Sequence, residues 1–122
     1  MQPLVVWTEI PVTDLQKSAD FYARVFGWKM DITTMGPNDV AIFNALTDAD
    51  EMTVGGHLYP GTPATGSTIH LALPDTVEAG ADRCTAAGGR VMGPPIEIPQ
   101  GRFQYATDPD GNSIALFEMK AP

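Results

Sequence analysis

The chain has 122 residues, of which 43% are hydrophobic and 18% are charged, a balance typical of one globular domain rather than a disordered chain. Fifteen Asp and Glu residues against seven Lys and Arg give a formal net charge of −8, which repels phosphate backbones and predicts no nucleic-acid partner. A single cysteine, Cys84, excludes an internal disulfide and a thiolate metal cluster. The first residues show no secretory signal, and no apolar run is long enough to cross a bilayer. We therefore expect a cytoplasmic protein with no membrane partner.

The first half of the chain has the pattern of a strand, a helix and further short strands. Residues 4–12 are rich in β-branched side chains and predict a strand. Asp14 is suited to cap a helix near residues 14–26, and Gly27 is suited to end it. The apolar face of this helix recurs at spacings of four, three and four residues, at Leu15, Ala19, Tyr22 and Phe26. Short apolar runs at 40–43 and 52–54 predict two more strands.

The second half repeats this pattern. Residues 68–73 predict a strand, and Asp75 with Glu78 three positions later forms a capping-box pattern for a helix near residues 75–87. Cys84 lies on the apolar stripe of this helix, where a cysteine is usually a small buried hydrophobe. The last two predicted strands, 103–106 and 113–119, flank a turn at 108–112.

The two halves superpose at a constant shift of 61 residues, which carries Asp14 onto Asp75 and Gly27 onto Gly88. Because the predicted strand, cap, apolar helix face and terminal glycine all coincide, the chain has the pattern of a duplicated module. The first module covers about residues 1–60 and the second about 67–122 of a single domain, and residues 59–66 form a linker rich in Pro, Gly and Thr.

Two motifs at opposite ends of this duplicated chain carry a family resemblance. They are Ile10-Pro11-Val12-Thr13-Asp14-Leu15 leading to Phe26-Gly27-Trp28, and Asp108-Pro109-Asp110-Gly111-Asn112 leading to Ala115-Leu116-Phe117-Glu118. With them the chain resembles the vicinal oxygen chelate superfamily, which includes glyoxalase I, extradiol dioxygenases and bleomycin-resistance proteins. The resemblance implies an α+β fold, the glyoxalase/bleomycin-resistance/dioxygenase fold, in which two tandem βαβββ modules form a curved sheet that encloses a cavity. It also implies a homodimer.

Enzymes of this superfamily hold one divalent metal with His, Glu or Gln on strands of both modules. The pattern places two of those ligands at Trp7 and Ala115, and the repeat places their counterparts at Thr68 and, by the shift of 61, at Val54. Three of these side chains cannot bind a metal, and a lone hydroxyl binds it poorly. The resemblance therefore implies a protein that binds a small-molecule ligand without the usual metal and without another cofactor. The side chains that we expect to line the cavity are Trp7, Glu9, Thr68, His70, Ala115 and Phe117. No catalytic residue is assigned.

A shifted metal site is the alternative. Glu9 and His70 lie two residues beyond Trp7 and Thr68, and alternation along a strand puts them on the same face. His57 follows Gly55-Gly56, where a bulge could turn it toward that face, and the repeat makes Glu118 its counterpart. Glu9, His57 and His70 could then hold zinc or iron for a metal-dependent lyase or dioxygenase of the glyoxalase type.

Other conspicuous side chains have two interpretations. The aromatic residues of the first module, Phe21, Tyr22, Phe26 and Trp28, are expected in the core or in a dimer contact. Arg90 and Arg102 are expected to be solvated or to receive an anionic group. A third function, a structural or interaction module, has no specific signal in the sequence.

Overall fold

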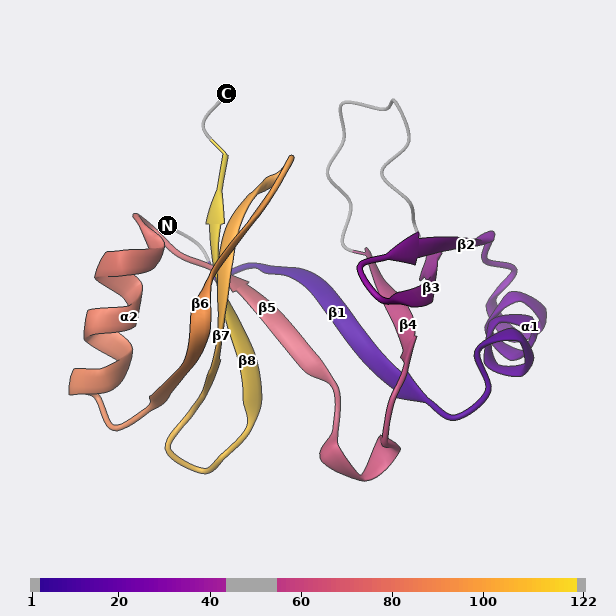
Figure 1. Ribbon diagram of the computed structural model, residues 1–122, viewed down its shortest axis with the longest axis horizontal. Coiled ribbons are helices and arrows are strands. Elements are labelled where there is room, and N and C mark those ends of the chain that lie inside the picture. The colour runs from indigo at the N-terminus through magenta and orange to yellow at the C-terminus, as the bar shows by residue number, and fades with distance from the viewer. Residues whose placement is uncertain (1–2, 44–54, 121–122) are drawn as a thin grey trace. The chain divides into compact units, whose positions relative to one another are not determined.

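The computed structural model describes residues 3–43 and 55–120, and it has two βαβββ modules in tandem (Figure 1). This confirms the predicted α+β fold. The first module consists of β1 (Val5–Val12), α1 (Leu15–Phe26), β2 (Met30–Met35), β3 (Asn38–Phe43) and β4 (Gly55–Pro60). The second consists of β5 (Thr68–Ala72), α2 (Val77–Ala86), β6 (Arg90–Ile98), β7 (Gly101–Thr107) and β8 (Ser113–Met119). A short 3-10 turn, Pro63–Thr65, lies in the segment predicted as a linker.

The chain divides into two compact units, Trp7–Ser67 and the chain from Thr68 onward together with the residues up to Val6. In the first unit the strand order is β2-β3-β4-β1, antiparallel except for the parallel pair of β1 with β4. In the second unit the order is β5-β8-β7-β6, antiparallel except for the parallel pair of β5 with β8. In each module, therefore, the first and last strands are parallel neighbours.

Helix α1 begins and ends where the sequence predicts. The Asp14 side chain accepts from the backbone N–H of Lys17 at 3.0 Å, as an N-cap does. Gly27 has φ 71° and donates its N–H to the carbonyl of Ala23 at 2.9 Å. A left-handed residue at this point costs glycine little, which is why the helix ends here.

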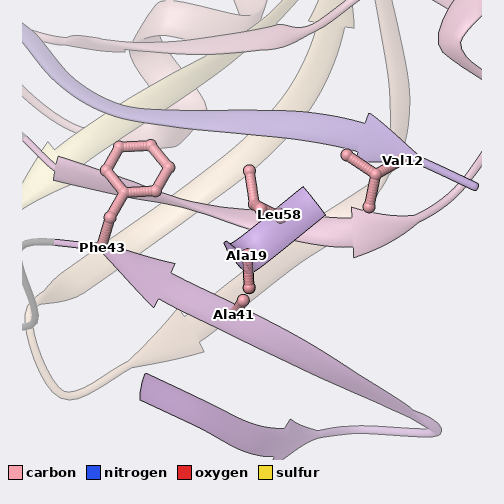
Figure 2. Packing of buried hydrophobic residues seen from close by; sticks show 5 residues of the cluster. All are labelled: Val12, Ala19, Ala41, Phe43 and Leu58. Carbon is pink, nitrogen blue, oxygen red and sulfur yellow. The ribbon is translucent and has the colours of Figure 1, made fainter. Parts of the chain in front are cut away.

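The core of the first module lies between α1 and one face of its sheet (Figure 2). Its members are Val12, Ala19, Ala41, Phe43 and Leu58, and Leu58 is completely buried. Ile10 of β1 also packs against this cluster. Because side chains alternate along a strand, the odd-numbered residues of β1 between Trp7 and Pro11 lie on the opposite face, away from α1.

Helix α2 begins at Val77, one residue later than the predicted cap Asp75 implies. Thr76 is the N-cap, and its hydroxyl accepts from the N–H of Ala79 at 3.2 Å. Asp75 instead accepts two hydrogen bonds from Arg83, at 2.7 and 2.8 Å. The capping-box interpretation of Asp75 and Glu78 is therefore wrong, because Thr76 supplies the capping oxygen and Glu78 binds Arg102.

Three strands, β2, β4 and β6, were not predicted from the sequence. Two of them contain residues that usually interrupt strands: β4 begins with Gly55-Gly56, and β6 contains Gly93-Pro94-Pro95. A shift of register between Met92 and Ile96 accommodates the second group. The strand predicted at 52–54 lies outside the described residues. Among the helices that the structure describes, none is both long and apolar enough to cross a membrane.

Candidate functional site

Four side chains gather on the face of the first module's sheet that points away from α1. Trp7 and Glu9 come from β1, and His57 and Tyr59 come from β4. The parallel register pairs Glu9 with His57 and Pro11 with Tyr59, so alternate residues of both strands share this face. Glu9 and His57 are buried, each with 9% of its surface exposed, whereas Trp7 and Tyr59 are half-buried. We call these four residues the Trp7–His57 cluster.

Trp7 determines which ring nitrogen of His57 carries the proton. The indole Nε1–H donates to Nδ1 of His57 at 2.9 Å, and the two rings are inclined at 53°. An indole nitrogen can only donate, so Nδ1 must carry a lone pair. A neutral imidazole with a lone pair on Nδ1 carries its proton on Nε2.

The Nε2 atom of His57 lies 3.4 Å from Oε1 of Glu9. The proton therefore sits on the ring nitrogen that lies beside a carboxylate. Tyr59 lies edge-on to His57, with 6.2 Å between ring centroids. Burial, and to a lesser extent the negative charge of Glu9, raises the pKa of the Tyr59 phenol, which keeps this hydroxyl protonated as a hydrogen-bond donor.

Gly56 explains how His57 reaches this position without the bulge considered above. The register between β1 and β4 runs unbroken from Trp7 opposite Gly55 to Val12 opposite Pro60. A Cβ at position 56 would collide with the carbonyl oxygen of Thr8 and would lie 2.7 Å from Cζ of Phe43. Glycine thus allows β4 to approach β1 closely, and ordinary strand alternation turns His57 toward Glu9.

In the second module, His70 is surrounded by aromatic rings. The rings of Phe103, Tyr105 and Phe117 meet it edge-on, with centroids 4.9, 6.0 and 5.9 Å away. Phe103 and Phe117 are nearly parallel to each other, with an angle of 4° between their planes. His70 has 3% of its surface exposed, so this arrangement is a buried aromatic cluster around one imidazole.

Thr68, at the start of the same strand, lies beside Ser113. Their hydroxyl oxygens are 2.6 Å apart, and either one could be the donor. Ala115 is completely buried and pairs with His70 across the parallel β5–β8 ladder. Among the residues proposed to line a cavity, the structure thus brings together Trp7 with Glu9 in the first module, and His70 with Ala115 and Phe117 in the second.

The strand register corrects one of the residue equivalences that the constant repeat shift predicts. Glu9 and His70 are equivalent in the first strands of the modules, Glu9 pairs with His57, and His70 pairs with Ala115. The residue equivalent to Ala115 is therefore His57 rather than Val54, which lies outside the described residues. The shift is 61 in the first strand but 58 in the last, because the connecting segments differ in length.

Glu118 is not the counterpart of His57. Its Oε1 accepts from the N–H of Val77, the first residue of α2, at 2.8 Å. It also accepts from Arg102 at 2.7 Å, and Arg102 binds Glu78 of α2 through both of its terminal nitrogens. Glu118 and Arg102 therefore lie on the helix-covered face, where they attach the start of α2 to the sheet.

The residues at the metal positions of the superfamily do not fit a metal. Trp7 and Ala115 offer no lone pair, and the Thr68 hydroxyl is paired with Ser113. At the fourth position His57 offers Nδ1 to Trp7 and carries its proton on Nε2, whereas a metal-bound imidazole needs a free lone pair. In the described ranges no group of three or more His, Cys, Asp or Glu side chains could hold one ion. The shifted site of Glu9, His57 and His70 stays a prediction.

Several residues of these clusters were not singled out from the sequence: Tyr59, Phe103, Tyr105 and Ser113. Strand alternation is the signal that could have identified the aromatic ones, because Tyr59 is two residues from His57, and Phe103 and Tyr105 are two residues apart on β7. Without the strand bounds, these aromatic residues cannot be distinguished from the other aromatic residues of the sequence.

The aromatic residues of α1 and the turn after it divide between core and surface. Tyr22 packs against the core, and Trp28 stacks on Phe43 with centroids 4.7 Å apart. Phe21 and Phe26 are more than half exposed. Cys84 is half-buried, and its Sγ fills the space where Gly89 lacks a side chain.

Comparisons with known proteins agree with this architecture. Residues 4–116 match the family model described as the Glyoxalase/Bleomycin resistance protein/Dioxygenase superfamily. A Mycobacterium tuberculosis protein named "Putative glyoxylase CFP32" is 30% identical over 97% of this chain. The match covers 44% of that protein, so the chain spans less than half the length of this curated relative. A "Glyoxylase-like domain-containing protein" of Didymella fabae is 25% identical over 88% of both chains.

Two solved structures share the fold at low identity. The hypothetical protein BH1468 from Bacillus halodurans superposes with a TM-score of 0.72 and 12% identity, covering 100% of this chain and 98% of its own. A methylmalonyl-CoA epimerase of Streptomyces coelicolor, solved with 2-nitronate-propionyl-CoA, superposes with a TM-score of 0.70 and 18% identity, covering 98% of each chain. At these identities the likeness concerns the fold alone.

Proposed function

Because this chain belongs to the glyoxalase/bleomycin resistance protein/dioxygenase superfamily, we propose that it binds a small molecule without the divalent metal that enzymes of this fold use. The ligand contacts the face of the first module's sheet that carries the Trp7–His57 cluster. The observation that carries this proposal is the hydrogen bond from the Trp7 indole to Nδ1 of His57.

The bond matters because it decides what His57 offers to a ligand. A metal binds an imidazole through a lone pair, and the other ring nitrogen then donates its proton to a second group. Trp7 reverses this arrangement, since its N–H occupies the Nδ1 lone pair and leaves Nε2 protonated. The cluster thus offers the Tyr59 phenol as a donor, the Glu9 carboxylate as an acceptor, and the flat face of an indole. These groups suit an organic ligand with polar substituents and a planar or apolar part.

The alternative, a metal-dependent lyase or dioxygenase using Glu9, His57 and His70 with zinc or iron, requires a different state of His57. The 3.4 Å separation of Glu9 and His57 brings two suitable donor groups together. However, metal binding at Nε2 would require that nitrogen to lose its proton, either to Nδ1, which would break the Trp7 hydrogen bond, or to another base, which would leave an imidazolate. The same observation that supports metal-free binding therefore weighs against this enzyme.

Tryptophan fluorescence offers a direct test because the chain has two tryptophans, Trp7 in the cluster and Trp28 after α1. The variant Trp28→Phe leaves Trp7 as the reporter in the proposed site. We expect some members of a library of small metabolites to quench Trp7 saturably with EDTA present. The substitutions Glu9→Ala and His57→Ala should weaken that binding. Quenching that appears only after zinc or iron is added would contradict the proposal.

We also propose that the protein acts in the cytoplasm as a homodimer. The support for a second copy is the apolar surface of the first module, where Phe26 and Trp28 are exposed beside α1. Cell fractionation tests the cytoplasmic location, and sedimentation velocity tests the dimer.

A further inference from the structure

The two outermost strands of the modules, β2 and β6, differ in how their free edges are protected. Among the described residues β2 pairs only with β3, and β6 pairs only with β7. An unpaired edge presents backbone donors and acceptors that another strand can use, so proteins usually block it.

The edge of β6 is blocked in three ways. Pro94 and Pro95 have no backbone N–H to donate, and the register is broken between Met92 and Ile96. The side-chain amide of Gln104 donates to the carbonyl of Gly93 at 2.6 Å, which fixes the irregular segment. Another strand cannot pair continuously along this edge.

The edge of β2 has none of these features. All six residues, from Met30 to Met35, pair with β3 in unbroken antiparallel register, and none is proline. Asp31 is the single charged residue of the strand. Ile32 and Met35 are each 45% exposed, although both are apolar.

An exposed aromatic pair lies on the same side of the module. Phe26 and Trp28 stack with their centroids 4.8 Å apart, and they have 54% and 39% of their surfaces exposed. Met30 packs into the core beneath α1, and alternation puts Ile32 on that same face of β2. The open backbone edge and the apolar surface are therefore parts of one module surface.

We propose that β2 of one copy pairs antiparallel with β2 of a second copy, so that this edge is the dimer interface. This inference rests on the homodimer proposed above and identifies the surface through which the two copies bind each other. A twofold axis normal to the sheet at Ile32 places Ile32 opposite its equivalent in the second copy, Met30 opposite Thr34 and Asp31 opposite Thr33. No like charges face each other in this pairing, which matters for a chain with a net charge of −8. The blocked β6 edge leaves β2 as the strand edge suited to self-pairing.

The test compares two matched substitutions in the full chain, Ile32→Lys on β2 and Met92→Lys on β6. Each replaces an exposed apolar side chain on an outer strand, with exposures of 45% and 50%. Sedimentation velocity over a concentration series should show a wild-type particle of twice 13.0 kDa. Ile32→Lys should raise the dimer dissociation constant at least about tenfold, because lysine on an edge opposes strand pairing. Met92→Lys should leave that constant unchanged.

The outcomes separate this inference from the proposals on which it rests. A monomeric wild-type protein would overturn the homodimer and its interface together. A wild-type dimer that resists Ile32→Lys, or that Met92→Lys dissociates equally, would overturn the β2 interface and leave the homodimer standing. Circular dichroism checks that each variant is folded, and amide exchange supplies a second readout on the wild type. Exchange of the β2 amides should slow as protein concentration rises, and exchange independent of concentration would also overturn the interface. Trp7 quenching reports ligand binding separately.

Discussion

Trp7 donates its indole N–H to Nδ1 of His57 across 50 positions of sequence, at 2.9 Å. This bond joins the first strand of the module to the last and sets the proton on the side of His57 that faces Glu9. The position that the resemblance assigns to a metal ligand therefore holds a donor that alters the chemistry of the neighbouring imidazole.

We predict that Trp7→Phe releases His57 from this single tautomer. Phenylalanine keeps an aromatic ring but lacks the N–H, so Nδ1 loses its donor. Nitrogen-15 NMR should find His57 protonated on Nε2 in the wild type and a mixture of tautomers in the variant. Loss of the hydrogen bond should also lower the free energy of unfolding by about 1–2 kcal/mol. Trp28→Phe is the control, and equal tautomer mixtures in both variants would contradict the assignment.

Acid stability should depend on Arg102. Its hydrogen bonds lower the pKa of Glu78 from 4.5 to about 2 and also lower the pKa of Glu118. A carboxyl whose pKa is lowered by folding stabilises the protein above its unfolded pKa, and this contribution is lost as the pH falls toward its folded pKa. In Arg102→Met the loss of stability between pH of about 4.5 and about 2 should therefore be smaller than in the wild type.

Urea unfolding at several pH values measures this difference. Arg24→Met, in the last turn of α1, is a control that should keep the acid dependence of the wild type. The carboxyls of Asp75 and Asp108, whose pKa values are lowered by other partners, titrate alike in all three proteins. An unchanged acid slope in Arg102→Met would show that these ion pairs do not affect stability.

Leu58→Ala should destabilise the first module strongly. Leu58 is completely buried in the cluster beneath α1, so truncation leaves a cavity that costs about 2–5 kcal/mol of unfolding free energy (Figure 2). Leu4→Ala, at a residue with 42% of its surface exposed, should cost no more than about 0.5 kcal/mol. Denaturant titration of both variants makes the comparison, and similar costs would contradict the assigned core.

Gly56→Ala should push β4 away from β1. The added methyl group would meet the Thr8 carbonyl and the Phe43 ring, and overpacking of this kind costs about 1–3 kcal/mol. The double variant Gly56→Ala/Phe43→Leu removes the ring contact but keeps the backbone contact. Thermal unfolding should therefore show a Gly56→Ala effect that is smaller in the Phe43→Leu background but still present. Full tolerance of Gly56→Ala would show that close strand approach is not what requires glycine.

The sequence predicted those elements whose boundaries are marked by side-chain chemistry. Asp14, the apolar stripe and Gly27 specify α1 locally, and the turn around Gly111 specifies the approach to β8. Helix α2 began later than expected because Asp75 and Thr76 are both suitable caps, and contact with Arg83 decides between them. The local sequence pattern alone could not predict the contact between Asp75 and Arg83.

The candidate site was predictable as a set of strand positions but not as a set of contacts. Glu9 and His70 were placed on one face of their strands by alternation. The bond between Trp7 and His57 depends on which residue of β4 lies beside β1, and the intervening segments of the two modules differ in length. A constant repeat shift therefore assigned the wrong partner to Ala115, and register corrected it to His57.

Metal stoichiometry of the purified protein tests metal-free binding most directly. Protein equilibrated with excess zinc or iron and then desalted is analysed for bound metal, together with Glu9→Ala and His70→Ala. We predict negligible metal in all three proteins and no rise in the wild-type melting temperature on adding either ion. About one equivalent of metal per wild-type chain, lost in both variants, would contradict the account and assign Glu9, His57 and His70 to a metal-dependent enzyme.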